Sequence, residues 1–372
     1  MPGTQRRSSD PARVATVDSL AAVSAAPTRE RLVSLDVTRG LAVAAMLAVN
    51  NEGINPGHPG WLRHPEWNGM SVADLVFPLF LFCIGVSSAL STRQMPTSPW
   101  NPSPAGQERS FAAAFRPMLK RFVILFLLGV GLSALKQHQI VLAGVLQHIA
   151  ITSLIAWFAL LLPRRGQYAV GAALLVGASV FGLWSGFENG HTLDQVVDRF
   201  LYSRETAEGL PVAIASVFNV LVGAWVGRRF RSGDHLRIVR SLVTWTLGPL
   251  ALGLAMSPWI PINKRLWTPS YALVGAGAAA GVSLAIYWMV DQLGWRRPFE
   301  WLRELGANPL AVYVGCSALA ALVPDAWRIT TVGWLADVLP VAVASVMWSV
   351  LWIVLAWVLA DQLWRRRILI KL

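Results

Sequence analysis

The stretch VADLVFPLFLFCIGVSSALS, residues 72–91, decides the fold class, because its only charged side chain is Asp74 near its start. At about 1.5 Å per residue, a helix of this length crosses the roughly 30 Å hydrocarbon core of a bilayer. Nine other apolar runs have similar lengths. They are residues 32–50, 118–136, 141–162, 168–187, 211–227, 239–260, 269–290, 306–323 and 341–360. We therefore predict an all-α, polytopic membrane protein with about ten transmembrane helices.

The composition agrees with a membrane protein. Of 372 residues, 55% are hydrophobic and only 14% are charged, whereas a soluble domain carries about 25% charged residues. These values exclude a secreted disulfide scaffold, a disordered protein and a soluble enzyme. We expect the only two cysteines, Cys83 and Cys316, to be packing residues, because both lie within apolar runs.

The net charge of +12 arises from 32 Lys and Arg against 20 Asp and Glu. In a soluble protein such an excess would suggest nucleic acid, but here the cations flank the apolar runs, so we expect no nucleic-acid partner. With the N-terminus inside, most cations fall on the cytoplasmic side, as the positive-inside rule requires. The exceptions are Arg63, Lys136, Arg199, Arg204, Lys264, Arg265 and Arg328. We predict that both termini are cytoplasmic.

The N-terminal residues carry no long apolar core, and Asp18 interrupts the only candidate for a signal sequence. We predict a disordered cytoplasmic tail over residues 1–28 and a single transmembrane domain over residues 29–372. The lipid bilayer is the first expected partner. The sequence is also compatible with a homodimer.

Polar side chains gather where the first span ends and the second begins. Ionisable groups in or beside a span cost several kcal/mol unless they are paired or face a cavity, so they mark candidate sites. His64 is suited to accept and return a proton near neutral pH. Asp74 could orient its ring if residues 65–70 turn back, and the Asn50 amide could donate to an oxyanion. In the alternative interpretation, His64 is an interfacial loop residue and Asp74 caps the second helix near Ser71.

A second polar group is predicted at the same membrane face. It comprises Gln147, His148, Asn263, Lys264, Arg265, Trp267, Ser270 and Tyr271. Lys264 and Arg265 lie where cations are scarce, which favours an anionic partner, although Lys, Arg, Trp and Tyr also serve as interfacial anchors. His58, His64 and Glu66 have no spacing that fixes a metal geometry, so we expect no metal.

Glycines at 275, 277 and 281 lie inside an apolar run, where Gly277-x-x-x-Gly281 favours close helix packing over phosphate binding. Cations at the cytoplasmic end of the third span suit an anionic nucleotide. Those cations are Arg116, Lys120 and Arg121.

Five motifs occur in an order that resembles the heparan-α-glucosaminide N-acetyltransferase family of membrane enzymes. They are RLVSLDVTRGLA (31–42), HPEWNGMSVADLVFPLF (64–80), GVLQH (144–148), PINKRLWTPSY (261–271) and NPLAVYV (308–314). The resemblance runs from about residue 29 to the C-terminus. Animal members carry a large luminal N-terminal domain that we do not find in this sequence, so a heparan acceptor is not carried over.

The resemblance implies transfer of an acetyl group from cytosolic acetyl-CoA to an amino sugar or glycan outside the cytoplasmic (plasma) membrane. The family's histidine, asparagine and aspartate fall on His64, Asn50 and Asp74. His64 would act as general base or as transient acyl carrier. The motifs also supply candidate substrate-binding residues, namely Trp67, Asn68, Gln147, His148, Asn263, Lys264, Trp267, Ser270 and Tyr271.

The sequence departs from the family's motifs at one position, and two other functions are alternatives to acetyl transfer. The family's usual Gln-Arg pair is Gln147-His148 here, so a donor contact by that arginine is not carried over. A sugar transporter or exporter would use the same cavity without chemistry, since spans interrupted by Pro and Gly suit it equally. A non-catalytic helper subunit of a glycan pathway is the third interpretation.

Overall fold

Ten helices follow the ten apolar runs. The computed structural model describes residues 32–54, 59–91, 96, 110–190, 192–202, 206 and 208–370, and this part contains α-helices and no strand. The ten are α2 (Val33–Asn50), α3 (Val76–Leu90), α4 (Phe111–Gln137), α5 (Val145–Leu160), α6 (Arg164–Ser185), α8 (Leu210–Phe230), α9 (His235–Met256), α10 (Pro269–Tyr287), α12 (Pro309–Leu322) and α14 (Val341–Arg365). Within the described part, eight spans built on these helices are long and apolar enough to cross a membrane. The predicted class, a multi-pass helical membrane protein, is confirmed.

Two of the ten runs do not form a long, straight helix. The run predicted at 141–162 forms α5 with only 16 residues, because the chain stays extended through Gly144 before the helix starts. The run predicted at 306–323 is bent by 79° where α11 (Glu300–Ala307) meets α12. Pro309 lacks a backbone N–H and disfavours the helical conformation at Asn308, whose ψ of 54° lies outside the helical region and ends α11.

Two short helices lie in connections where we predicted none. They are α7 (Leu193–Tyr202), after α6, and α13 (Asp325–Ala336), after α12. The predicted N-terminal tail and His58 lie outside the described residues. The sidedness of the termini stays a prediction.

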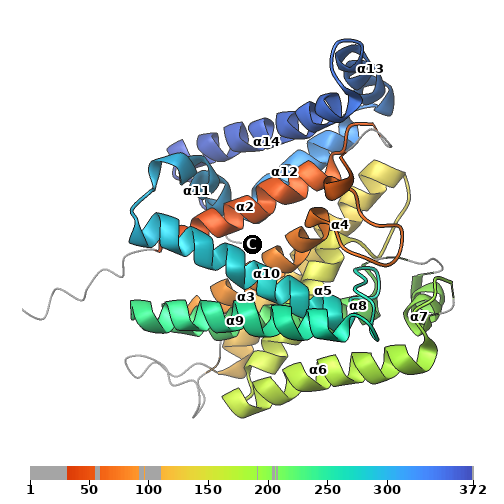
Figure 1. The fold of residues 1–372 in the computed structure, drawn as a ribbon. Coiled ribbons are helices and arrows are strands. Elements are labelled where there is room, and N and C mark those ends of the chain that lie inside the picture. The colour runs from red at the N-terminus through yellow and green to blue at the C-terminus, as the bar shows by residue number, and fades with distance from the viewer. Residues whose placement is uncertain are drawn as a thin grey trace, which may run out of the picture. The chain divides into compact units, whose positions relative to one another are not determined.

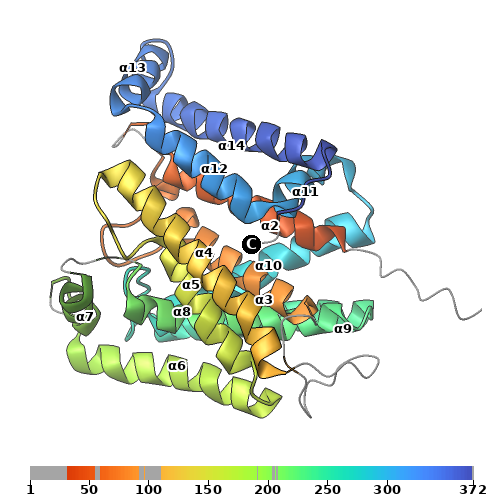
Figure 2. The same cartoon turned by 180° about the vertical axis from the view of Figure 1, so that it is seen from behind.

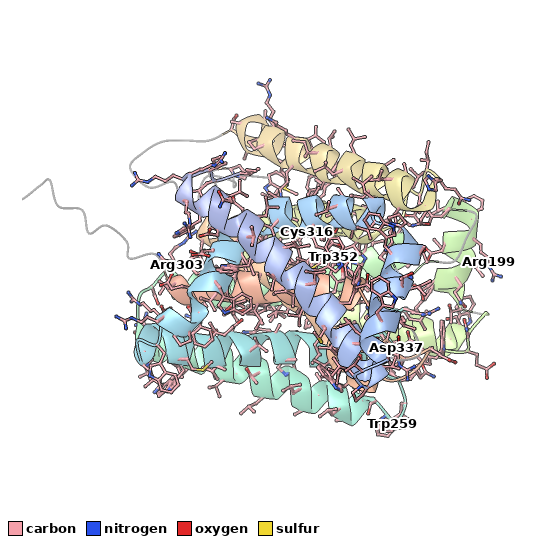
Figure 3. The ribbon with its side chains drawn as sticks, turned by 90° about the horizontal axis from the view of Figure 1, so that it is seen from above. Arg199, Trp259, Arg303, Cys316, Asp337 and Trp352 are labelled. Atoms are coloured by element: carbon pink, nitrogen blue, oxygen red, sulfur yellow. The ribbon has the colours of Figure 1, made fainter. Side chains whose placement is uncertain are left out.

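The helices of Val33–Leu372 belong to one unit. Within it, α2 packs against α11, α3 against α8, and α9 against α10. Figures 1 and 2 show α12 and α14 on the side of α2, with α8 and α9 on the other side and α6 beyond them. In Figure 3, α14 runs obliquely across the view, with Trp352 labelled on it.

Glycines set the closest helix contacts. A Cβ atom at Gly85 of α3 would overlap the carbonyl oxygen of Val220, and one at Gly223 of α8 would overlap that of Phe82. The two backbones therefore touch directly, as small residues allow in membrane bundles. Gly277 packs against α9 with no room for a side chain, so the predicted close packing is confirmed. These contacts hold α3 firmly, and the candidate site lies at its start.

Candidate functional site

His64 and Asp74 lie side by side at one end of the bundle. His64 follows the 3₁₀ turn η1 (Gly60–Leu62), and Asp74 lies in η2 (Val72–Leu75), which leads into α3. The intervening chain turns back through Gly69, with φ +110°, whose N–H donates to the Ile262 carbonyl at 2.8 Å. This turn places Nδ1 of His64 2.6 Å from Oδ1 of Asp74.

Asp74 is fixed from three directions. It is only 1% exposed, and its Oδ2 accepts hydrogen bonds from the Ser71 N–H at 2.9 Å and the Ser71 hydroxyl at 3.3 Å. The Tyr271 hydroxyl donates to the Asp74 main-chain carbonyl at 2.6 Å. Asp74 therefore caps η2 and holds His64 at once, so the two interpretations of its role are not exclusive.

The hydrogen bonds assign the histidine tautomer. Because the Asp74 carboxylate only accepts, the proton of a neutral His64 ring lies on Nδ1, and Nε2 keeps its lone pair. Nζ of Lys264 lies 3.1 Å from Nε2, 3.3 Å from Nδ1 and 3.5 Å from Oδ1 of Asp74. The Lys264 ammonium is thus almost equally distant from the two ring nitrogens and close enough to Asp74 to offset its charge. Burial lowers the pKa of Lys264, against the opposing attraction of Asp74 and Glu208.

These side chains face a cavity of about 450 Å³, a size typical of small-molecule sites. Its lining includes His64, Asp74, Lys264 and Asn50. Nδ2 of Asn50 donates to the hydroxyl of Tyr313 at 3.0 Å, so the amide is anchored toward α12. A second cavity, of about 670 Å³, adjoins the first. The two share the lining residues Val49, Asn50, Val145, Thr206 and Glu208.

The other predicted substrate residues divide into two groups. Trp67 lines the 450 Å³ cavity, with Nε1 donating to the Phe187 carbonyl at 2.7 Å, and Gln147 lines the 670 Å³ cavity. The remaining six line neither cavity and make hydrogen bonds within the protein. They are Asn68, His148, Asn263, Trp267, Ser270 and Tyr271.

The bonds of this second group build the frame of the site. Nε1 of Trp267 donates to Oδ1 of Asn219 at 3.1 Å, and Oδ1 of Asn263 accepts from the Leu266 N–H at 3.1 Å. The Asn263 amide donates to Asn68 at 3.1 Å, which ties the loop before α10 to the His64 loop. These hydrogen bonds position Lys264 next to His64.

The three cations predicted for a nucleotide lie on the first half of α4, which starts at Phe111 and not near residue 118. Arg116 and Lys120 are exposed. Arg121 is half-buried, and its buried Nε has no hydrogen-bond partner among the residues that the structure describes. None of the three lines either cavity.

Three carboxylates of the 450 Å³ cavity were not predicted. Asp194 and Asp198 come from α7, and Glu208 precedes α8. Burial raises the pKa of Asp194 to about 6. The spacing of Asp194 and Asp198, four residues apart on one helical face, was the available signal, but nothing in the sequence placed that face against His64.

Metal ligation has no candidate in the described ranges, because no group of three or more His, Cys, Asp or Glu side chains is close enough to hold an ion. The chemistry of the 450 Å³ cavity is that of an oriented imidazole next to an ammonium and an amide. This combination suits proton transfer to or from an amine with charge stabilisation nearby.

The sequence matches the family described as heparan-alpha-glucosaminide N-acetyltransferase, catalytic, over residues 31–292. The chain belongs to this family. The resemblance to this family is thereby confirmed. The matched segment holds the first four motifs, with His64, Asp74 and Lys264, whereas the fifth motif, residues 308–314, lies beyond it. Membership makes the chain part of an acyltransferase family of integral membrane proteins.

Two relatives carry the name heparan-alpha-glucosaminide N-acetyltransferase. The chain is 25% identical to the Homo sapiens protein over 383 residues, covering 80% of this chain and 54% of that protein. It is also 25% identical to the Mus musculus protein over 412 residues, covering 88% of this chain and 59% of that protein. The chain therefore spans little more than half the length of these acetyltransferases.

Proposed function

We propose that this protein transfers an acetyl group from cytosolic acetyl-CoA to the amine of an amino sugar or glycan outside the cytoplasmic membrane. The observation that carries the proposal is the His64–Asp74 hydrogen bond of 2.6 Å in a cavity that also holds Lys264 and Asn50. Family membership supplies the acyl-transfer class and acetyl-CoA as co-substrate.

In this proposal Nε2 of His64 removes a proton from the acceptor amine while the amine nitrogen bonds to the thioester carbonyl carbon. The same proton passes to the departing CoA sulfur when the C–S bond breaks, so the ring returns to its starting tautomer. Asp74 keeps the ring oriented and stabilises it while it is protonated. Lys264, which lies beside the ring, and Asn50 stabilise the oxyanion of the tetrahedral intermediate.

The same nitrogen would serve a covalent route. There Nε2 bonds to the acetyl carbon, CoA leaves, and the amine takes the acetyl group from the ring in a second step. Labelled acetyl-CoA without acceptor separates the routes, because only the covalent route leaves label on the protein.

For the donor nucleotide we propose Arg121, with Arg116 and Lys120 at the same end of α4. The guanidinium of Arg121 has a buried Nε to which no described residue is hydrogen-bonded, and guanidinium groups bind phosphates in a fork geometry. Arg121→Gln should then raise the KM for acetyl-CoA.

The test is acetyl transfer by purified protein, with labelled acetyl-CoA and glucosamine. Wild type should form N-acetylglucosamine, and folded His64→Ala protein should not. Unchanged activity in His64→Ala would eliminate this chemistry. Glucosamine counterflow in liposomes without acetyl-CoA would instead support the transporter interpretation.

A further inference from the structure

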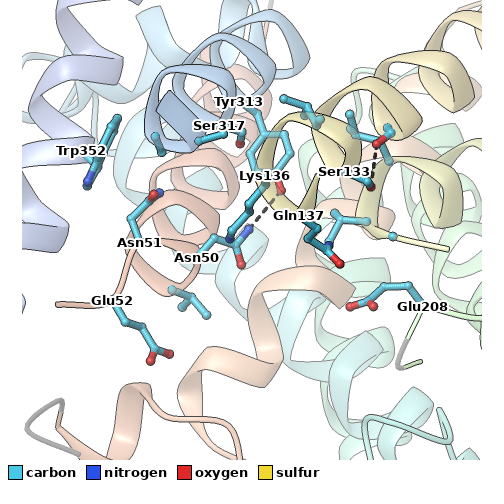
Figure 4. A pocket seen from close by; sticks show the side chains of 18 of the residues that line it. Asn50, Asn51, Glu52, Ser133, Lys136, Gln137, Glu208, Tyr313, Ser317 and Trp352 are labelled. Atoms are coloured by element: carbon cyan, nitrogen blue, oxygen red, sulfur yellow. Dashed lines mark hydrogen bonds between the residues drawn. The ribbon is translucent and has the colours of Figure 1, made fainter. Parts of the chain in front are cut away.

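The 670 Å³ cavity has no role in the reaction proposed above, although it adjoins the catalytic one. Asn50 and Glu208 line both, so a ligand in the larger cavity lies directly next to the His64 cavity. Figure 4 shows Asn50, Tyr313 and Ser317 gathered in it, with Lys136 and Gln137 of α4 opposite and Trp352 at its edge.

The C-terminal helices complete this cavity. Tyr313 and Ser317 come from α12, Arg328 from α13, and Trp348 and Trp352 from α14. These helices follow residue 292, where the family match ends. The catalytic cavity, in contrast, takes its whole lining from within the matched segment. The larger cavity is therefore built jointly by the matched segment and by the helices that follow it.

Its walls are preorganised. The Ser349 hydroxyl donates to the Asn51 carbonyl at 3.0 Å, and the Ile54 N–H donates to the Ser345 hydroxyl at 3.2 Å. Nη1 of Arg328 donates to the Gly53 carbonyl at 2.7 Å. Helices α13 and α14 thus clamp the turn after α2, which keeps the cavity open without a bound ligand.

The lining combines aromatic rings with polar groups. Trp348 and Trp352, one helical turn apart with centroids 6.3 Å apart, form an aromatic wall, and Tyr313 adds a hydroxyl. The amides Asn51 and Gln147 also line the cavity. Amides and hydroxyls both donate and accept, while indole faces pack against C–H groups. A sugar residue offers both kinds of surface, since it carries several hydroxyls around an apolar ring face.

The charged side chains of the lining indicate which class of sugar the 670 Å³ cavity would bind. Arg328 is paired with Asp325 at 2.8 Å. Among the described residues, the other charged side chains of the lining are the carboxylates of Glu52 and Glu208 and the ammonium of Lys136. This slightly acidic lining favours a neutral or amine-bearing sugar over a sulfated one. Glu208 lies at the junction, where it would meet an amine or hydroxyl of either sugar.

We propose that the 670 Å³ cavity binds a second sugar residue of the acceptor, so that the preferred acceptor is an unsulfated oligosaccharide containing glucosamine. The proposal rests on the proposed function, in that the first sugar presents its amine to His64. The second sugar lies between Tyr313 and the Trp348–Trp352 wall.

The experiment compares glucosamine with β-1,4-linked diglucosamine as acceptors, and measures binding of each to the same protein by calorimetry without acetyl-CoA. Ser317→Phe fills the cavity and removes no core packing. Trp352→Ala is the second variant, with thermal unfolding used to verify that it folds. Trp334→Ala, on the exposed face of α13, is the matched tryptophan control.

For wild type and Trp334→Ala, we expect kcat/KM for the disaccharide to exceed that for glucosamine about tenfold, roughly the effect of one good hydrogen bond. Ser317→Phe should bring this ratio near one and abolish disaccharide binding. Equal use of both acceptors by wild type, or a ratio unchanged in Ser317→Phe, would overturn the subsite. So would a preference for a sulfated disaccharide.

The two proposals fail separately. If wild type acetylates neither sugar, the proposed function is wrong, yet disaccharide binding that Ser317→Phe abolishes still supports the subsite. If glucosamine is acetylated and the disaccharide binds no better than glucosamine, the chemistry stands and the subsite is rejected.

Discussion

Asp74→Asn tests the central pair with the smallest change in shape. Oδ2 of Asp74 accepts from two donors on Ser71, so the side-chain oxygen of the introduced asparagine must occupy that position. Its NH₂ group then faces Nδ1 of His64, which lies 2.6 Å from the carboxylate in the wild type. An NH₂ donor requires an acceptor, so the ring proton moves to Nε2, and Nε2 can no longer take a proton from the acceptor.

The size of the loss follows from these bonds. Losing a hydrogen bond to a charged acceptor costs about 1.5–3 kcal/mol, or roughly 10- to 150-fold. Holding a catalytic histidine in the wrong tautomer reduces kcat by about 10⁴ in the serine-protease triad. We therefore expect kcat/KM to fall between about 10²- and 10⁴-fold, with little change in the affinity for acetyl-CoA.

The assay is acetyl transfer to glucosamine in detergent, after the unfolding temperature has shown that the variant folds. Asp234→Asn is the control, because Asp234 caps α9 away from the site and Asn caps helices equally well. Asp74 acts through His64 in this reasoning, so the double variant with His64→Ala should be no slower than His64→Ala alone. Folded Asp74→Asn protein with kcat/KM within about threefold of wild type would refute it.

Three further predictions concern charge and packing. Lys264→Met removes a positive charge 3.1 Å from Nε2 of the part-exposed His64 ring; loss of one group that stabilises the oxyanion should lower kcat for acetyl transfer by about 10²-fold, and an unchanged kcat would contradict that role. Burial raises the pKa of Asp194 to about 6, so the free energy of unfolding decreases as pH rises through 6 and the buried carboxyl ionises. Asp194→Asn should therefore raise the free energy of unfolding at pH 7.5 by up to about 3 kcal/mol. Thermal unfolding should show this gain shrinking toward pH 4. A methyl group at Gly85 would overlap a backbone carbonyl of α8, whereas one at Gly131 meets open space; Gly85→Ala should cost about 3 kcal/mol in denaturant titration and Gly131→Ala almost nothing.

Hydropathy located the helices because a lipid-facing backbone must be helical and covered by apolar side chains. It missed α11 and its bend into α12, since α11 carries the charged residues Glu300, Arg303 and Glu304, and only Pro309 marks the break. It also missed α7 and α13, which are too short to form spans. Run length therefore predicts which segments are helical better than it predicts where each one bends.

The site was partly accessible from the sequence. His64 and Asp74 are ten residues apart, so a local turn sufficed to suggest their pairing. Lys264 was singled out by its charge, but its contact with His64 joins residues 200 positions apart and depends on the packing of α3 and α10. Trp352 gave no signal, because a tryptophan in a span looks the same whether it faces lipid, the core or a cavity.

The direct backbone contact between α3 and α8 has a practical consequence for laboratory evolution. Gly85 and Gly223 leave no room for any larger residue, so libraries that randomise this crossing will consist mainly of misfolded clones. Positions on α12 and α14 that border the larger cavity are better targets. New acceptor preferences should be sought there, where altered side chains change the ligand and leave the scaffold in place.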